Sequence, residues 1–284
     1  MIFGTIFSHF ADDGPAVHIA PGGVLHLGPL TVTNSILYGW ICIAVMCVVL
    51  IAVARRMSVK PRGGLTQFVE LGVEFIAGTV ESAFSDRQRA RRYIPYFVTL
   101  FFFLLINNWL GLVPGVGEAL TVRGIPLLRP FTGDYNGTLA AAVVTMLMVY
   151  TASARESGGV KRYIRHFFVG SPLNPIYLVI GILEMITDLM RTVSLSLRLF
   201  LNVTIGEIII AVFSYLGHIA APLTAAPFML VELFVGALQA YIFVTLSIMY
   251  LAAVANHGGD EAHEPLTEAA VPETMGASPA AEAG

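Results

Sequence analysis

The chain has 284 residues, of which 56% are hydrophobic and only 12% are charged. A soluble domain of this length carries about twice that share of charge, so the composition excludes an ordinary water-soluble protein and indicates a membrane protein. The formal net charge of -3 excludes little, because the charges are segregated along the chain.

The chain opens with a segment that does not resemble a signal peptide. Residues 1–33 contain no lysine or arginine, and Asp12 and Asp13 interrupt their apolar start. Residues 36–54 are free of charge and are followed by two arginines. At 1.5 Å per residue this run spans a bilayer core of about 30 Å, so it is predicted to be the first membrane-spanning helix.

Residues 65–84 are predicted to form an amphipathic helix. Glu70, Glu74 and Glu81 fall within one narrow arc of a helical wheel, away from the apolar side chains. A helix that lies on lipid usually carries lysines on its polar face, whereas this one is acidic. We therefore favour a helix at the membrane interface that packs on protein; the alternative is a helix on the lipid surface.

Two further spans are predicted over residues 93–113 and 136–153. A basic turn, 86–92, precedes the first of them, and a basic loop, 155–166, follows the second. Because lysines and arginines gather on the cytoplasmic side of a membrane, these segments are expected to be cytoplasmic. The same rule places the N-terminus outside.

The last two apolar stretches are too long for simple spans. Residues 175–216 and 227–255 would form helices of roughly 63 Å and 43 Å, against a bilayer core of about 30 Å. Ordinary tilts of about 20° do not absorb this excess, so these helices either break or lie far from the membrane normal. The predicted fold class is an all-α membrane protein. It has about five membrane-embedded helices plus one amphipathic interfacial helix, the last two helices forming a long, strongly tilted hairpin.

Three regions follow from this organisation. Residues 1–33 form an outer-side N-terminal segment, and residues 34–255 form the membrane domain. Residues 256–284 carry six acids and no lysine or arginine, so a disordered, acidic, cytoplasmic tail is predicted there.

Charged and amide side chains occur where a membrane helix is normally apolar. A charge at bilayer depth costs at least about 2.5–3.5 kcal/mol, so each needs a partner or a path to water. At 100° per residue most of those in the longest stretch share a face with Arg198, whereas Glu207 points to the opposite side. The residues are Glu184, Asp188, Arg191, Arg198, Asn202 and Glu207 in the longest stretch, and Glu232 and Gln239 in the last.

Two interpretations remain open for Glu184, Asp188 and Arg191. They have a structural role, as groups at the membrane interface or paired with one another, or they take part in the function. For Arg198, Glu207 and Glu232 a functional role is favoured, because their spacing offers no simple one-to-one salt bridge and a guanidinium stays protonated. Two carboxyl groups on adjacent helices can exchange a proton through a few waters, while a fixed cation beyond them repels a hydrated proton. Such a set is typical of a gated proton pathway.

Four segments resemble one known family. Arg191-Thr-Val-Ser-Leu-Ser-Leu-Arg198-Leu-Phe-Leu-Asn202, followed by Gly206-Glu207, is similar to the signature of subunit a of the F-type ATP synthase. Gln239-Ala-Tyr-Ile-Phe resembles the second signature of this family. Asn107-Asn-Trp-Leu-Gly-Leu-Val-Pro114 and Asp134-Tyr-Asn136-Gly-Thr138 match it as well. The resemblance covers roughly residues 30–256.

The resemblance implies a non-catalytic, proton-translocating stator of the Fo sector, in a bacterial plasma membrane, that couples proton flow to ATP synthesis. Its implied partners are a ring of c subunits, which Arg198 would face, and the peripheral-stalk b subunits, which residues 65–84 would meet. Arg198 would also separate two offset aqueous half-channels, and neither a cofactor, a metal nor nucleic acid is implied. Asn202 and Gln239 would lie near this arginine, Glu207 and Glu232 would line the outer half-channel, and Glu184 would lie near the inner one.

Two positions depart from the family pattern. Family members often carry a histidine where this chain has Glu207 or Glu232, and commonly a glycine where it has Leu201. Two rival functions for such a chain are a secondary transporter and an intramembrane hydrolase. A secondary transporter usually shows repeated halves with broken helices, and no repeat is visible here. An intramembrane hydrolase needs a metal motif or a nucleophile elbow, and the sequence has neither; it also has no P-loop.

Overall fold

The computed structural model describes residues 23–27, 30–56, 63–113, 116–122, 125–156, 159, 175–217 and 220–260. Most of the predicted outer N-terminal segment, most of the basic loop after the third span and most of the acidic tail lie outside these residues.

Five helices of the described chain are long and apolar enough to cross a membrane, as predicted. They are α2 (Asn34–Arg56), α4 (Arg87–Gly111), α5 (Tyr135–Glu156), α7 (Pro175–Gly217) and α8 (Ala221–Asp260). The shorter helix α3 (Gly64–Ala83) corresponds to the predicted amphipathic segment. The all-α membrane fold class is therefore confirmed.

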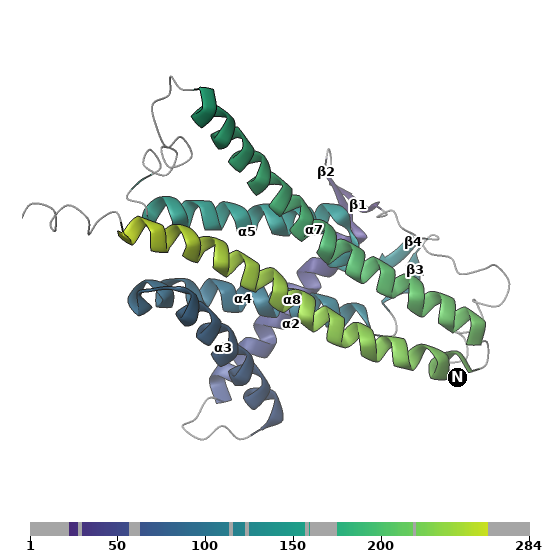
Figure 1. Ribbon diagram of the computed structural model, residues 1–284. Coiled ribbons are helices and arrows are strands. Elements are labelled where there is room, and N and C mark those ends of the chain that lie inside the picture. The colour runs from purple at the N-terminus through teal and green to yellow at the C-terminus, as the bar shows by residue number, and fades with distance from the viewer. Residues whose placement is uncertain are drawn as a thin grey trace, which may run out of the picture.

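Two small hairpins were not anticipated from the sequence. Strand β1 (Gly23–Leu27) pairs with β2 (Leu30–Thr33), and β3 (Gly117–Val122) pairs with β4 (Ile125–Leu128), both antiparallel. A short 3-10 helix, η2 (Phe131–Gly133), joins β4 to α5. Both hairpins lie on the same side of the helix bundle (Figure 1). Strands this short carry too few residues for a clear alternating pattern.

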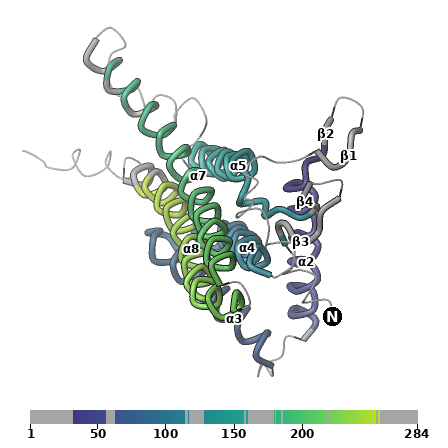
Figure 2. Tube along the Cα trace, turned by 90° about the vertical axis from the view of Figure 1, so that its right-hand side faces the viewer, coloured from purple at the N-terminus to yellow at the C-terminus, as the bar shows by residue number. Residues whose placement is uncertain are grey.

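Helices α7 and α8 form the predicted long hairpin and neither of them breaks. They have 43 and 40 residues, so each is roughly 60–65 Å long. The apolar part of α7 alone has 37 residues, or about 55 Å, and it fits a 30 Å bilayer core only with a strong tilt. The two helices lie side by side near their turn, and the start of α7 diverges from the bundle in both views (Figures 1 and 2).

The turn between α7 and α8 is held by side chains from both helices. The hydroxyl of Thr224 donates to the carbonyl of Phe213 at 2.8 Å, and the rings of Phe213 and Phe228 stack with centroids 3.9 Å apart. Helix α8 therefore begins directly after the turn, at Ala221. The start expected at Pro227 was six residues too late, since this proline lies inside α8.

The basic segment expected as a turn before α4 is instead its first two turns. Asp86 caps this helix by accepting a hydrogen bond from the backbone N–H of Gln88 at 2.8 Å, and it also lies 3.5 Å from Arg89. An aspartate at this position satisfies a free N–H group at the start of the helix. Because arginine is a good helix former, the following arginines continue the helix rather than interrupt it.

Helix α3 packs on protein, as favoured from its acidic face. Its buried residues include Ile76 and Val80, and the ring of Phe75 lies 5.0 Å from that of Tyr241 in α8. Asn256, near the end of α8, donates to the carbonyl of Ala83 at 3.1 Å and accepts from the N–H of Ser85 at 3.2 Å. The end of α3 is thereby fastened to α8.

Candidate functional site

Arg198 lies on the outward face of α7. On the same outward face Leu201 and Ile205 are apolar and exposed, at 46% and 51% accessible, and Ser194, one turn before Arg198, is exposed as well. The opposite face of α7, which includes Leu195 and Leu199, is buried in the bundle. The Arg198 side chain is exposed and makes neither an ion pair nor a hydrogen bond with any of the described residues. The structure thus presents a permanent cation on an apolar surface.

Asn202 and Gln239 carry buried amide groups close to the level of Arg198. Asn202 follows Arg198 by about one helical turn, and Gln239 in α8 is 5% exposed. The Nδ2 atom of Asn202 and the Nε2 atom of Gln239 lack a hydrogen-bond partner among the described residues. Buried amides of this kind normally bind water or a polar group of another chain.

Glu232 reaches α7 at a glycine. A β-carbon built on Gly206 would stand 2.6 Å from Oε1 of Glu232, and closer still to the other carboxylate atoms. The carboxylate of Glu232 therefore occupies the space that any larger residue at position 206 would need. Because α7 and α8 run antiparallel, this contact also places Gln239 near the level of Leu199 and Arg198.

Glu207 lies next to this contact and faces η2. Its Oε1 and Oε2 atoms would stand 3.5 and 3.6 Å from a β-carbon on Gly133. Glu207 also interacts electrostatically with Glu232 and with Arg129, and Tyr38 of α2 interacts electrostatically with it. The structure thus brings together the two carboxylates that the sequence placed on adjacent helices.

Arg129, which the sequence reasoning did not single out, lies beside this pair. It is 4% exposed, and its Nη2 atom donates to the carbonyl of Gly133 at 2.9 Å. The signal that could have found it is a lone arginine between apolar residues, just before the Asp134 motif. A cation in such surroundings is rarely buried without a partner.

The motif that begins at Asp134 ties three helices together. Asp134 accepts hydrogen bonds from the hydroxyl of Ser35 at 2.6 Å and from the backbone N–H of Asn136 at 3.0 Å, which joins the start of α2 to the start of α5. Thr138 lies 3.3 Å from the hydroxyl of Ser196 in α7. These bonds hold the elements that surround Glu207.

The motif that ends α4 positions α8. Asn108 donates to the carbonyl of Gly236 at 3.0 Å, and the indole N–H of Trp109 donates to the carbonyl of Leu233 at 3.0 Å. Both acceptors flank the turn of α8 that follows Glu232. The level of Glu232 along the bundle is therefore set partly by α4.

The polar groups near the start of α7 pair with one another. Arg191 lies 3.0 Å from Asp188, and its guanidinium stacks over the ring of Tyr250 at 3.7 Å. Of the two interpretations left open for these residues, mutual pairing is realised for Asp188 and Arg191. Glu184 lies in α7, but its side chain is outside the part that the structure describes. No three potential metal ligands gather within the described residues.

The sequence is similar to those of known proteins. The sequence model of the family described as ATP synthase A chain matches residues 36–252, which is most of the chain. The chain belongs to this family. It is therefore a multi-pass, proton-translocating component of the membrane sector of an ATP synthase.

Several curated relatives carry the same designation. ATP synthase subunit a of Moorella thermoacetica is 32% identical over 236 residues, which cover 83% of this chain and 96% of that protein. ATP synthase subunit a of an Anaeromyxobacter species is 31% identical over 277 residues, 92% of this chain but only 64% of that longer relative. ATP synthase subunit a 2 of Prosthecochloris aestuarii is 29% identical over 278 residues, 91% of this chain and 81% of that protein.

Proposed function

We propose that this chain is the stator against which a ring of c subunits turns, and that Arg198 separates two offset aqueous half-channels. The observation that carries this proposal is the exposed guanidinium on the apolar face of α7. A charge at bilayer depth costs at least about 2.5–3.5 kcal/mol, and no described residue of this chain compensates it. Its partner is then an acid on another chain, and a carboxylate on each passing c subunit has the required charge.

The outer half-channel would run past Glu232 and Glu207. Their carboxylates lie on neighbouring helices and interact with each other, so a proton can pass between them through a short path. The unpartnered amides of Asn202 and Gln239 continue this polar route toward Arg198. A route with hydrogen-bonding groups at each step is what a proton needs to cross an apolar bundle.

The inner half-channel would open near Glu184, at the other end of α7. Arg198 stays protonated at any accessible pH, and it would repel a hydrated proton that tried to pass directly between the two half-channels. A proton would then cross only on a ring carboxylate that has turned through the lipid. Each charge that crosses 100 mV supplies about 2.3 kcal/mol, so several protons are needed for each ATP.

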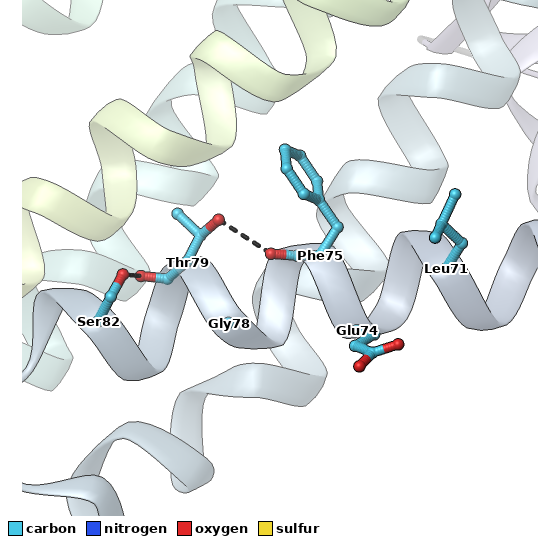
Figure 3. Close-up of a pocket in the computed structure, with 6 residues that line it drawn as sticks. All are labelled: Leu71, Glu74, Phe75, Gly78, Thr79 and Ser82. Atoms are coloured by element: carbon cyan, nitrogen blue, oxygen red, sulfur yellow. Dashed lines mark hydrogen bonds between the residues drawn. The ribbon is translucent and has the colours of Figure 1, made fainter.

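The exposed flank of α3 beside its contact with α8 would receive the peripheral-stalk b subunits. A hollow of about 480 Å³ lies on this face, lined by Leu71, Glu74, Phe75, Gly78, Thr79 and Ser82. Figure 3 shows Leu71, Phe75 and Thr79 pointing to one side of α3 and Glu74 to the other. Exposed apolar side chains beside a glycine provide close packing for a helix of another subunit.

The remaining expectations belong to the same proposal. The complex would lie in a bacterial plasma membrane, with the N-terminus outside and the C-terminal tail in the cytoplasm, because the basic residues gather at 55–92 and 155–165. The nucleotide chemistry would be carried out by other subunits.

The decisive test replaces Arg198 by alanine in the complete ATP synthase, reconstituted in vesicles. We expect the variant complex to assemble and to hydrolyse ATP, but to show no ATP-driven proton pumping. The matched control is Arg91→Ala. Arg91 is an exposed arginine near the start of α4, and its ion-pair partner, at 3.6 Å, is Glu81 of α3. Coupled pumping by the Arg198→Ala complex would refute the proposal.

A further inference from the structure

Arg129 is a buried cation that the proposed proton route does not use. It lies between β4 and η2, and only 4% of it is accessible. Its neighbour Pro130 packs against the end of α4, where a β-carbon on Gly111 would stand 3.1 Å from the proline ring. The segment that carries Arg129 is therefore enclosed by the bundle.

Gly133 connects Arg129 to Glu207. Its carbonyl accepts the hydrogen bond from Nη2 of Arg129 at 2.9 Å, while its α-carbon faces both carboxylate oxygens of Glu207. The backbone of η2 fixes the spacing between these groups, because the N–H of Gly133 donates to the carbonyl of Pro130 at 3.0 Å. Arg129 and Glu207 also interact electrostatically. The cation and the carboxylate thus belong to one local unit.

The chemistry of proton transfer gives such a cation a use. A carboxyl group that relays protons is an anion for part of each cycle. An anion in an apolar interior is unstable unless a cation or hydrogen-bond donors accompany it. A guanidinium serves this purpose well, since it keeps its charge and presents several donors in a rigid fork.

We propose that Arg129 is a positioning residue for proton uptake, holding Glu207 against η2 and balancing its charge each time the proton moves on. This inference rests on the proposed role of Glu207 in the outer half-channel. It adds a second arginine to the pathway, with a task different from that of Arg198. Arg198 faces another chain, whereas Arg129 acts on a residue of its own chain.

The alternative is that Arg129 only stabilises η2 through its hydrogen bond to Gly133. The two possibilities differ in whether Arg129 acts through Glu207. Coupling between two contacting residues appears as non-additivity, which a double-mutant cycle measures. The cycle needs Arg129→Gln, Glu207→Gln and the double variant, each in the complete ATP synthase reconstituted in vesicles, with the initial rate of ATP-driven proton pumping as the readout.

We expect Arg129→Gln to lower the pumping rate roughly tenfold in the native background, and by less than about twofold when Glu207 is already glutamine. Arg129→Lys, which keeps the charge, should retain most of the rate. Arg91→Gln, at an exposed arginine near the start of α4, serves as the control. Equal fold losses from Arg129→Gln in the two backgrounds would overturn the inference, even where Glu207→Gln slows pumping as proposed.

Two other outcomes are equally informative. If Glu207→Gln leaves the rate unchanged, the proposed relay fails and the role of Arg129 fails with it. If Arg129→Gln prevents assembly, the amount of assembled complex replaces the pumping rate as the quantity measured for the two single variants and the double variant. A carboxylate left without its cation should then regain a stable environment when it is neutralised, so Glu207→Gln should restore assembly. Failure to restore it would identify Arg129 as purely structural.

Discussion

The close approach of Glu232 to Gly206 leads to a sharp prediction for Gly206→Ala. The added β-carbon would stand 2.6 Å from Oε1 of Glu232, whereas ordinary contacts are roughly 3.5 Å. The other two carboxylate atoms would lie closer still, so the carboxylate must retreat by more than about 1 Å. A displacement of this size can cost a transfer step about 100-fold. We expect proton pumping by the reconstituted complex to fall by roughly 10- to 100-fold.

This loss should not come from a weaker helix. Alanine is a better helix former than glycine by about 1 kcal/mol, so α7 itself should gain stability. Two matched controls test the steric cause. A β-carbon on Gly133 would meet the Glu207 carboxylate at 3.5 Å, which is ordinary contact, and one on Gly64 would meet nothing within 4 Å. Gly133→Ala and Gly64→Ala should therefore keep nearly the full pumping rate.

A second substitution checks the direction of the displacement. In Gly206→Ala/Glu232→Asp the shorter side chain withdraws from the added methyl group, so part of the lost rate should return. If the Gly206→Ala complex pumps at the native rate, pumping does not depend on the close contact between Glu232 and α7, and the prediction is wrong.

Three further predictions concern the relay, the α3 face and the start of α2. Glu207→Gln and Glu232→Gln should each slow proton flux in vesicles, and the double variant should be nearly inactive; unchanged flux in both single variants would remove the relay. Gly78→Leu should fill the hollow on α3 and lower the amount of b subunit that purifies with the complex, whereas Gly64→Leu, outside the hollow, should not. Ser35→Ala removes the 2.6 Å hydrogen bond to Asp134 and should destabilise the detergent-solubilised complex by about 1.5–3 kcal/mol. Thermal unfolding measures this loss, and Ser85→Ala, at an exposed serine outside the α3 hollow, is the control.

Much of the fold is predictable from local patterns in the sequence. The five apolar helices and the amphipathic α3 follow from hydropathy and periodicity, which depend only on residues close together in the chain. The excess length of α7 and α8 already required a strong tilt or a break. Local patterns misjudged the segment before α4, since a run of arginines is equally compatible with a turn and with a first helical turn capped by Asp86.

The relations between helices depended on packing. The 3.6-residue period shows which side chains share a face of α7, but the level at which α8 meets that face depends on where small residues allow close approach. Gly206 decides this for Glu232. Arg129 reaches the same cluster only because η2 folds back toward α7. Individual polar residues could thus be predicted from their cost in an apolar helix, whereas their assembly around Glu207 arises from tertiary contacts between segments distant in the chain.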